Sequence, residues 1–241
     1  MTSISADSLA NSAAASEKTR AELAYKLISK DLLAGRFEPS SRLRLNELKL
    51  RYDLGLSPLR EALLRLASEG LVVAEGQRGF AVAPVSAVEL IDLTRTRQQI
   101  EAIALSAAIA QGNEEWEANI LSAFHRLSRT PLPDSMDDFD AVMNWESRHR
   151  AFHDALVAAC DSPWLLRFHS QLLDHSERYR RLRMISPPPA AANSARDRDT
   201  EHREIMEAVL ERNAPKACEL MNKHLQRTAD AAFPKAATKA A

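Results

Sequence analysis

Four histidines carry the clearest chemical signal in this chain of 241 residues. His149 and His153 are four residues apart in a helical pattern, so they share one helix face. His202 and His224 lie eleven residues before and after Asn213, where two predicted antiparallel helices meet. The two histidines would therefore lie at the same height along neighbouring helices. Four imidazoles converging inside a helical bundle would suit Zn²⁺, and Ni²⁺ or Cu²⁺ less readily. Spacing alone leaves open the alternative that they are ordinary polar residues of the core or surface.

Catalysis is the competing use of such side chains. The sequence contains no HExxH, no GxSxG, no P-loop and no glycine-rich dinucleotide loop. Asp154 and Glu201 each stand next to a histidine of the set and could support a ligating ring from outside the metal site, but we expect both to face water. A histidine-rich site without a carboxylate base favours ligand binding over hydrolysis, so we do not expect an enzyme. The other histidines are expected to be structural or solvated: His125, His169 and His175.

The composition is typical of a globular protein without a membrane segment. Hydrophobic residues make up 45% of the chain and charged residues 27%. No apolar run approaches the roughly 20 residues of a membrane span, and the N-terminus has no basic region typical of a signal peptide. Cys160 and Cys218 are expected to be free thiols in a reducing compartment. We therefore expect a cytoplasmic protein with no membrane partner.

Charge is distributed unevenly, although the formal net charge is only −1. Residues 17–85 hold 12 Lys and Arg against 9 Asp and Glu, a net charge of +3. Residues 86–241 hold 20 against 23, a net charge of −3. The near-neutral total therefore does not exclude DNA as a partner of the basic part.

Residues 17–85 have the pattern of a winged helix-turn-helix domain, after a disordered tail over residues 1–16. Apolar spacing predicts helices over residues 17–33 and 44–53. A third helix is predicted over residues 58–69, with Ser57 as its N-cap, Pro58 as its first residue and Gly70 after its end. The segments LVVAE and FAVAP then form a hairpin around residues 76–79. The third helix would enter the major groove of DNA, and the hairpin would touch the backbone or the minor groove.

The rest of the chain is predicted to be helical, in a second domain over residues 86–233 followed by a flexible tail over residues 234–241. Ser86 and Glu89 have the spacing of a capping box at its first helix. The predicted helices span residues 87–111, 114–129, 139–160, 163–184, 196–212 and 214–232. The expected fold is mainly α, an N-terminal winged helix-turn-helix plus a C-terminal six-helix antiparallel bundle.

Several stretches of the sequence resemble a known family. The segments FEPSSRLRLNEL, LGLSPLREAL and RLASEGLV are similar to the signature of GntR-family transcription regulators. RQQIEAIAL, FHDAL and HREIMEAVLERNAPKACELMNKHL resemble the FCD effector domain of the FadR-like subfamily. EGLVVAEGQRGFAVAPVS is similar to the CsiR-like branch, the carbon-starvation-induced regulators. The resemblance covers about residues 17–233 and implies a DNA-binding transcription regulator.

The resemblance also implies roles in DNA binding. Ser57 would contact phosphate, and Arg60 a base edge or phosphate. Leu56 stands where family members often carry a base-reading arginine, a departure that bears on the operator half-site. Further implied contacts are those of Arg42, Arg44 and Asn46 with the backbone, and those of Gln77 and Arg78 at the wing tip. Taken singly, each basic residue could equally be a solvated surface charge.

In FCD domains the metal site combines an Asp-xxx-His pair with two later histidines. The matching positions here are His149, His153, His202 and His224. His149 replaces the usual Asp or Asn, which removes a negative charge from the site. The resemblance implies a divalent metal cofactor, zinc first and nickel second. Arg97 occupies a position whose arginine often faces the ligand, where a buried guanidinium would hold a carboxylate in bidentate fashion.

These inferences combine into one expected mechanism. A homodimer would place two winged helices on a pseudo-palindromic operator, and a small carboxylate metabolite in the bundle would release the DNA. Repression is expected rather than activation, on the habit of the family. Two alternatives stay open, a constitutive DNA-binding protein with an empty bundle and a metal-dependent enzyme on a helical bundle.

Overall fold

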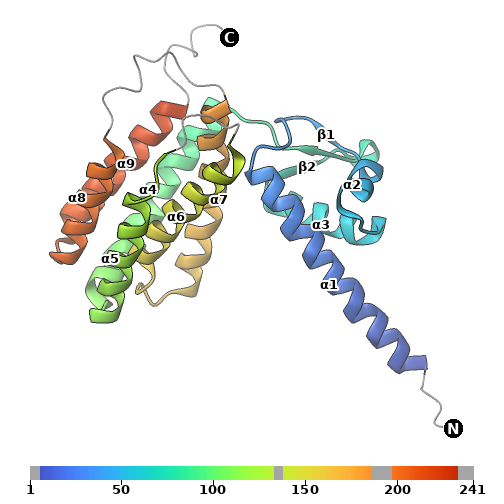
Figure 1. Ribbon diagram of the computed structural model, residues 1–241, viewed down its shortest axis with the longest axis horizontal. Coiled ribbons are helices and arrows are strands. Elements are labelled where there is room, and N and C mark those ends of the chain that lie inside the picture. The colour runs from blue at the N-terminus through green and yellow to red at the C-terminus, as the bar shows by residue number, and fades with distance from the viewer. Residues whose placement is uncertain (1–5, 133–137, 186–196, 233–241) are drawn as a thin grey trace, which may run out of the picture. The chain divides into compact units, whose positions relative to one another are not determined.

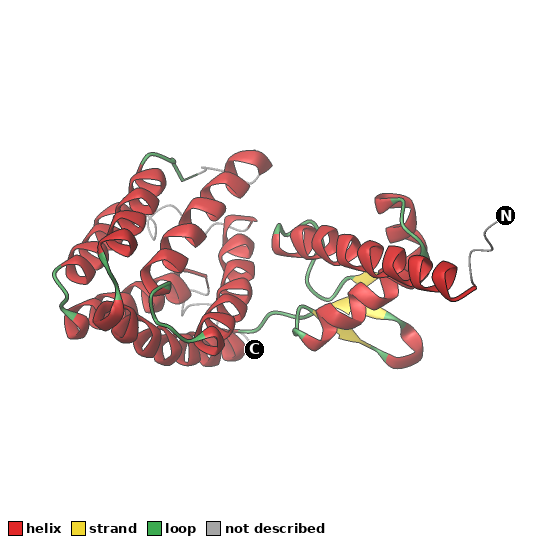
Figure 2. Cartoon of the chain, turned by 90° about the horizontal axis from the view of Figure 1, so that it is seen from below, coloured by secondary structure: helices red, strands yellow, loops and turns green. Residues whose placement is uncertain are grey.

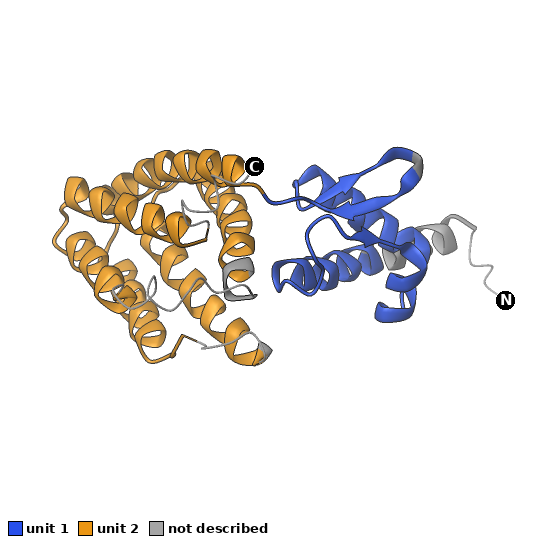
Figure 3. Cartoon of the chain, turned by 90° about the horizontal axis from the view of Figure 1, so that it is seen from above, with its two compact units in different colours: residues 1–85 blue, residues 86–241 orange. Residues whose placement is uncertain are grey.

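The computed structural model describes residues 6–132, 138–185 and 197–232. The chain divides into two compact units, one of residues 1–85 and one of residues 86–241 (Figure 3). Each unit has a buried apolar cluster of its own.

The first unit combines helices with a small antiparallel sheet (Figures 1 and 2). Its elements are α1 (Ala6–Leu33), β1 (Arg42–Leu43), α2 (Leu45–Tyr52), α3 (Leu56–Ser68), β2 (Val72–Ala74), the 3₁₀ turn η1 (Gly76–Arg78) and β3 (Phe80–Val82). The strands lie in the order β1-β3-β2, with Leu43 opposite Phe80 and Val73 opposite Ala81. Ile28 of α1 and Leu63 of α3 are fully buried in the core beneath this sheet. This is the winged helix-turn-helix that the sequence predicts.

Two helix starts in the first unit differ from the sequence-based expectation. α1 begins at Ala6, whereas the sequence predicts a disordered tail over residues 1–16. The residues before Glu17 are rich in alanine, which favours continuation of a helix towards the N-terminus. α3 begins at Leu56 with the extended Gly55 as its N-cap, so the prediction of Ser57 as N-cap is wrong. Pro58 is tolerated inside the first turn because the N–H groups there have no partner within the helix.

The second unit is a helical bundle, as predicted (Figure 1). Its described helices are α4 (Ala87–Gln111), α5 (Glu114–Ser128), α6 (Phe139–Val157), α7 (Pro163–Ile185), α8 (Arg198–Leu210) and α9 (Ala214–Ala232). α4 packs against α7 and α9, while α5 packs against α6 and α8. The Ser86 hydroxyl caps α4 by accepting a hydrogen bond from the Glu89 backbone N–H at 3.0 Å. Residues of α6, α8 and α9 share one buried apolar cluster, with Phe152, Ile205 and Met221 among its members.

None of the described helices is both long enough and apolar enough to cross a membrane.

Candidate metal centre and ligand cavity

The bundle brings the four predicted histidines together. His149 and His153 lie on α6, His202 on α8 and His224 on α9, and all four are buried. One ring nitrogen from each lies within 4.8 Å of those of the others. The Nε2 atoms of His149 and His153 are 3.2 Å apart. Four nitrogen donors at these separations can close around one first-row divalent metal ion.

Aromatic neighbours restrict how the imidazole rings can turn. The Trp145 ring stacks on His149 with the ring centroids 4.8 Å apart. Phe152 packs edge-on against His153 at 5.7 Å and against His202 at 5.4 Å, again between centroids. The cluster therefore sits in an apolar, tightly packed setting that fixes its geometry.

Carboxylates orient two histidines of the bundle. Glu201 Oε2 lies 2.9 Å from His224 Nδ1, which leaves His224 Nε2 for a metal. Carboxylate partners of this kind fix the tautomer of a metal-binding histidine. Glu201 is buried and also accepts from Arg227, so the expectation that it faces water is wrong. Asp154 is half-exposed and holds the buried His169, with Oδ1 and Nε2 3.1 Å apart.

Burial keeps the central rings uncharged. Burial lowers the pKa of His149 well below its ordinary value, and the positive charge of Arg180 lowers it further. Burial likewise lowers the pKa of His153, followed by the effects of His224 and Arg97. A metal binds neutral imidazole, so both rings are in the protonation state that ligation requires.

We expect the metal-free protein to lose stability as the pH falls from 7 to 5. The folded state keeps these rings neutral, whereas the unfolded chain takes up protons below a histidine pKa of about 6.5. Below that pKa the unfolded state binds more protons than the folded state does. The free energy of unfolding therefore decreases as the pH is lowered. For His149 and His153 the loss approaches about 2.7 kcal/mol per pH unit well below pH 6.5.

Urea unfolding at a series of pH values measures this dependence. His149→Gln/His153→Gln should flatten the slope, and substitution of the exposed His125 by Gln is the matched control. Parallel slopes for the double variant and the wild-type protein would contradict the expectation.

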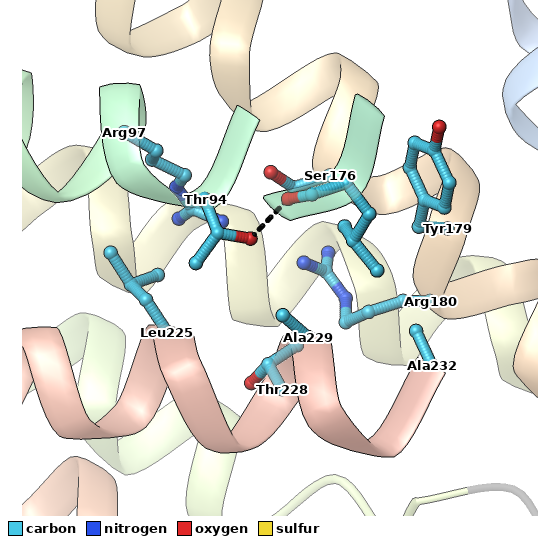
Figure 4. A pocket seen from close by; sticks show the side chains of 10 residues that line it. Thr94, Arg97, Ser176, Tyr179, Arg180, Leu225, Thr228, Ala229 and Ala232 are labelled. Atoms are coloured by element: carbon cyan, nitrogen blue, oxygen red, sulfur yellow. Dashed lines mark hydrogen bonds between the residues drawn. The ribbon is translucent and has the colours of Figure 1, made fainter. Parts of the chain in front are cut away.

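A small cavity lies between α4, α7 and α9 (Figure 4). Its volume is about 20 Å³, enough for one water-sized group. Arg97 of α4 and Arg180 of α7 line it, and their guanidinium groups point into the space between the helices. Both arginines also lower the pKa of His153, so their charges act on the histidine cluster. The cavity and the histidines thus share one electrostatic environment.

Arg97, the predicted effector residue, is buried as expected, with 3% of its surface exposed. Its Nε donates to Glu101 Oε1 at 2.5 Å, one helical turn further along α4. Its Nη2 has no hydrogen-bond partner among the described residues. The structure thus places a fixed, partly unsatisfied guanidinium at the wall of the cavity.

Sequence reasoning missed Arg180. Residues 178–181 include three arginines, all of them buried, and helical spacing alone does not show which of them lines the cavity. The structure places Arg180 there, and it binds Glu146 of α6 through two contacts, Nη2 to Oε2 at 2.6 Å and Nε to Oε1 at 3.3 Å. The acid that holds it lies on the same helix as His149 and His153.

The predicted DNA-binding residues lie in the first unit, on or beside β1, α2, α3 and η1. Arg42 is on β1, Arg44 precedes α2 and Asn46 is on α2, and all three are exposed. Ser57 and Arg60 are exposed on the N-terminal half of α3, and Arg78 is exposed on η1. Arg44 Nη1 also contacts Glu47 at 2.9 Å. Gln77 is on η1, but its side chain lies outside what the structure describes.

A winged helix-turn-helix with exposed basic residues, joined to a helical bundle with a buried histidine cluster, is the architecture of a DNA-binding transcription regulator. Residues 20–82 match the model of the bacterial regulatory proteins of the gntR family, and residues 92–227 match the FCD domain. The chain belongs to the GntR family and is a DNA-binding regulator with an FCD domain. This agrees with the expectation that it is not an enzyme, since its relatives are regulators.

Individual relatives cover most of the chain. It is 38% identical to the HTH-type transcriptional repressor GlaR of Escherichia coli K12, over 83% of this chain and 90% of the relative. It is 37% identical to the HTH-type transcriptional regulator BphR of Paraburkholderia xenovorans, over 85% and 82%. The solved structure of E. coli McbR/YncC has the same fold, with a TM-score of 0.72 and 19% identity over 90% of this chain and 98% of that one. Placement in the CsiR-like branch stays a prediction.

Proposed function

We propose that this protein is a repressor whose dimer binds a pseudo-palindromic operator and releases it when a small carboxylate binds in the FCD bundle. The observation that carries this proposal is the buried four-histidine cluster, which shares its surroundings with two cavity-lining arginines. The similarity to a named repressor supports repression as the direction of control.

The DNA-binding part of the proposal assigns the recognition role to α3. The inward side of this helix holds Leu59, Leu63 and Leu66 in the core, while Ser57 and Arg60 face outward. An exposed arginine near the N-terminal end of such a helix can reach base edges or phosphates. The remaining proposed backbone contacts are those of Arg42, Arg44, Asn46, Gln77 and Arg78.

Substitution Arg60→Ala should weaken operator binding by roughly 1–3 kcal/mol if the arginine reads a base. Binding of the wild-type protein should also weaken steeply with salt, because phosphate contacts release counterions. Fluorescence anisotropy with operator DNA measures both effects. Lys26→Ala is the matched control, since it removes an exposed positive charge from α1 instead of α3. Equal operator affinity for Arg60→Ala and Lys26→Ala would remove α3 from the recognition role.

The metal part of the proposal rests on the donor set. His149, His153, His202 and His224 would hold a divalent ion, zinc in the first place and nickel in the second. When bound, the ion would supply a positively charged anchor for an effector oxygen. Four neutral ligands leave the charge of the ion uncompensated, which favours an anionic effector. Glu201 supports His224 from outside the ligand set.

The effector part assigns Arg97 to a carboxylate. A buried guanidinium with a free N–H direction forms charge-assisted hydrogen bonds that are stronger than neutral ones. The effector would bind more tightly to the arrangement of the protein that does not bind DNA than to the one that does. This difference in effector affinity would release the operator.

The dimer part is supported by one face of the bundle. On this face α4 and α7 carry exposed apolar side chains, among them Ile103, Trp164 and Phe168. A groove of about 510 Å³ between the two helices is lined partly by Phe168. A symmetric partner covering this face would give the two-fold symmetry that a pseudo-palindromic operator requires.

We further propose that the protein acts in the cytoplasm, where its operator is.

A constitutive DNA-binding protein with an empty bundle is the remaining alternative. Binding of the protein to operator DNA, measured with and without small organic acids, separates the two. Release by an acid supports regulation, and unchanged binding supports the alternative.

A further inference from the structure

Two buried guanidinium groups face the same cavity with hydrogen-bonding capacity to spare. Arg97 and Arg180 have 3% and 7% of their surface exposed. Within the part of the chain that the structure describes, Arg97 Nη2 and Arg180 Nη1 have no acceptor. A buried donor without an acceptor costs free energy, so two on one cavity call for an explanation.

Both groups are held from behind by carboxylates. Glu101 fixes Arg97 through Nε, and Glu146 fixes Arg180 through Nε and Nη2. Because these contacts use other nitrogens, they leave Arg97 Nη2 and Arg180 Nη1 unengaged. Figure 4 shows the two guanidinium groups reaching the cavity from different helices, α4 and α7. The arrangement is a preformed pair of donors rather than two flexible surface side chains.

The two positive charges also oppose each other. Burial lowers the pKa of the Arg97 guanidinium, Glu101 counters this effect, and the charge of Arg180 lowers the pKa again. An anion placed between the two guanidinium groups would offset this repulsion and accept both unengaged N–H groups. The cavity of about 20 Å³ holds one water-sized group, which is the size of a single carboxylate oxygen and not of a whole metabolite.

We infer that Arg97 and Arg180 form one oxyanion subsite that holds a single carboxylate group of the effector. Arg180 is then a second effector-binding residue, which neither the sequence motifs nor the family match assigns. The inference rests on the proposed function in that it takes the bundle to be the effector-binding unit. It adds that the carboxylate accepts hydrogen bonds from both α4 and α7, through Arg97 and Arg180. Binding would therefore stabilise the contact between these two helices.

Acetate is a suitable probe, because it is little more than the carboxylate group itself. Thermal unfolding of the full chain is followed with increasing sodium acetate against sodium chloride at equal ionic strength. The series is run on zinc-loaded and on chelator-treated protein. We expect acetate to raise the melting temperature above the chloride baseline in both states, because the arginines bind it without the metal.

The variants remove one arginine together with its carboxylate partner, so that no buried charge is left alone. Arg180→Met/Glu146→Gln and Arg97→Met/Glu101→Gln should each weaken acetate binding by roughly 10- to 100-fold. Arg180→Lys keeps the charge but loses the second N–H direction, and it serves if the double variants do not fold. Arg95→Met, on an exposed arginine of α4, is the matched control and should bind acetate like the wild-type protein.

Three results would overturn the inference. They are a wild-type protein that acetate stabilises no more than chloride does, an Arg180 variant with unchanged acetate affinity, and an acetate effect that disappears entirely on chelation. Operator binding is not part of this measurement. Acetate binding without any operator release would therefore contradict the proposed function while leaving the subsite in place.

Discussion

Removing the metal is expected to lower the melting temperature of the bundle by roughly 8–16 °C. A ligand bound only by the folded state at about 1,000 times its dissociation constant stabilises it by about 4 kcal/mol. For a domain of this size, each kcal/mol corresponds to about 2–4 °C. His153→Ala and His202→Ala should lose the metal and respond to chelator no further. Metal content by mass spectrometry and calorimetric melting with and without chelator measure the effect.

The matched control is His125→Ala, which removes an exposed histidine from α5 of the same bundle. It should keep the metal content and the chelator response of the wild-type protein. If purified wild-type protein carries no metal and melts identically with chelator, the four histidines are a buried polar cluster and not a metal centre.

Loss of Arg97 is expected to raise the effector concentration needed for operator release by roughly 30-fold or more. Truncating one partner of a buried charge pair costs about 2 kcal/mol at least. Operator affinity without effector should stay nearly unchanged, because the DNA contacts belong to the other unit. Arg97→Met/Glu101→Gln is the informative variant, since Arg97→Ala alone would leave Glu101 buried without its partner.

The measurement is a mobility-shift assay of wild-type and variant proteins across an effector titration. Arg97→Lys tests whether charge alone is enough, and Arg95→Met controls for the loss of an arginine from α4. Operator release at the wild-type midpoint by the double variant would exclude Arg97 from the effector site.

The sequence predicted the fold well where local signals were strong. Apolar spacing located the helices of both units, and β-like runs around residues 76–79 located the wing. It failed at helix starts. Ser57 and Pro58 have the residue types of an N-cap and a first helical position, yet Gly55 takes the extended conformation and α3 starts at Leu56. Helix starts depend on the local backbone path, which residue type alone does not determine.

The four histidines of the site were predictable because their spacing within one helix, or on either side of one turn, shows which of them lie close together. His149 and His153 share a face of α6. His202 and His224 lie at equal distances before and after the turn at Asn213, which places them side by side on α8 and α9. The partners of these residues come from packing between helices that are distant in sequence. The sequence offers Glu201 as a possible partner of the adjacent His202, but not its contact with His224 on the next helix, and the contact of Arg180 with Glu146 has no fixed spacing at all. This is why Arg180 emerged only from the structure.

The most direct test of the account is the operator affinity of zinc-loaded protein at a saturating concentration of an organic acid that calorimetry shows to bind it. The acid should lower operator affinity by roughly 5- to 150-fold, the usual range of coupling between two sites. This effect should be strongly reduced in His153→Ala and in Arg97→Met/Glu101→Gln. An unchanged operator affinity with the acid bound would contradict the proposed regulation.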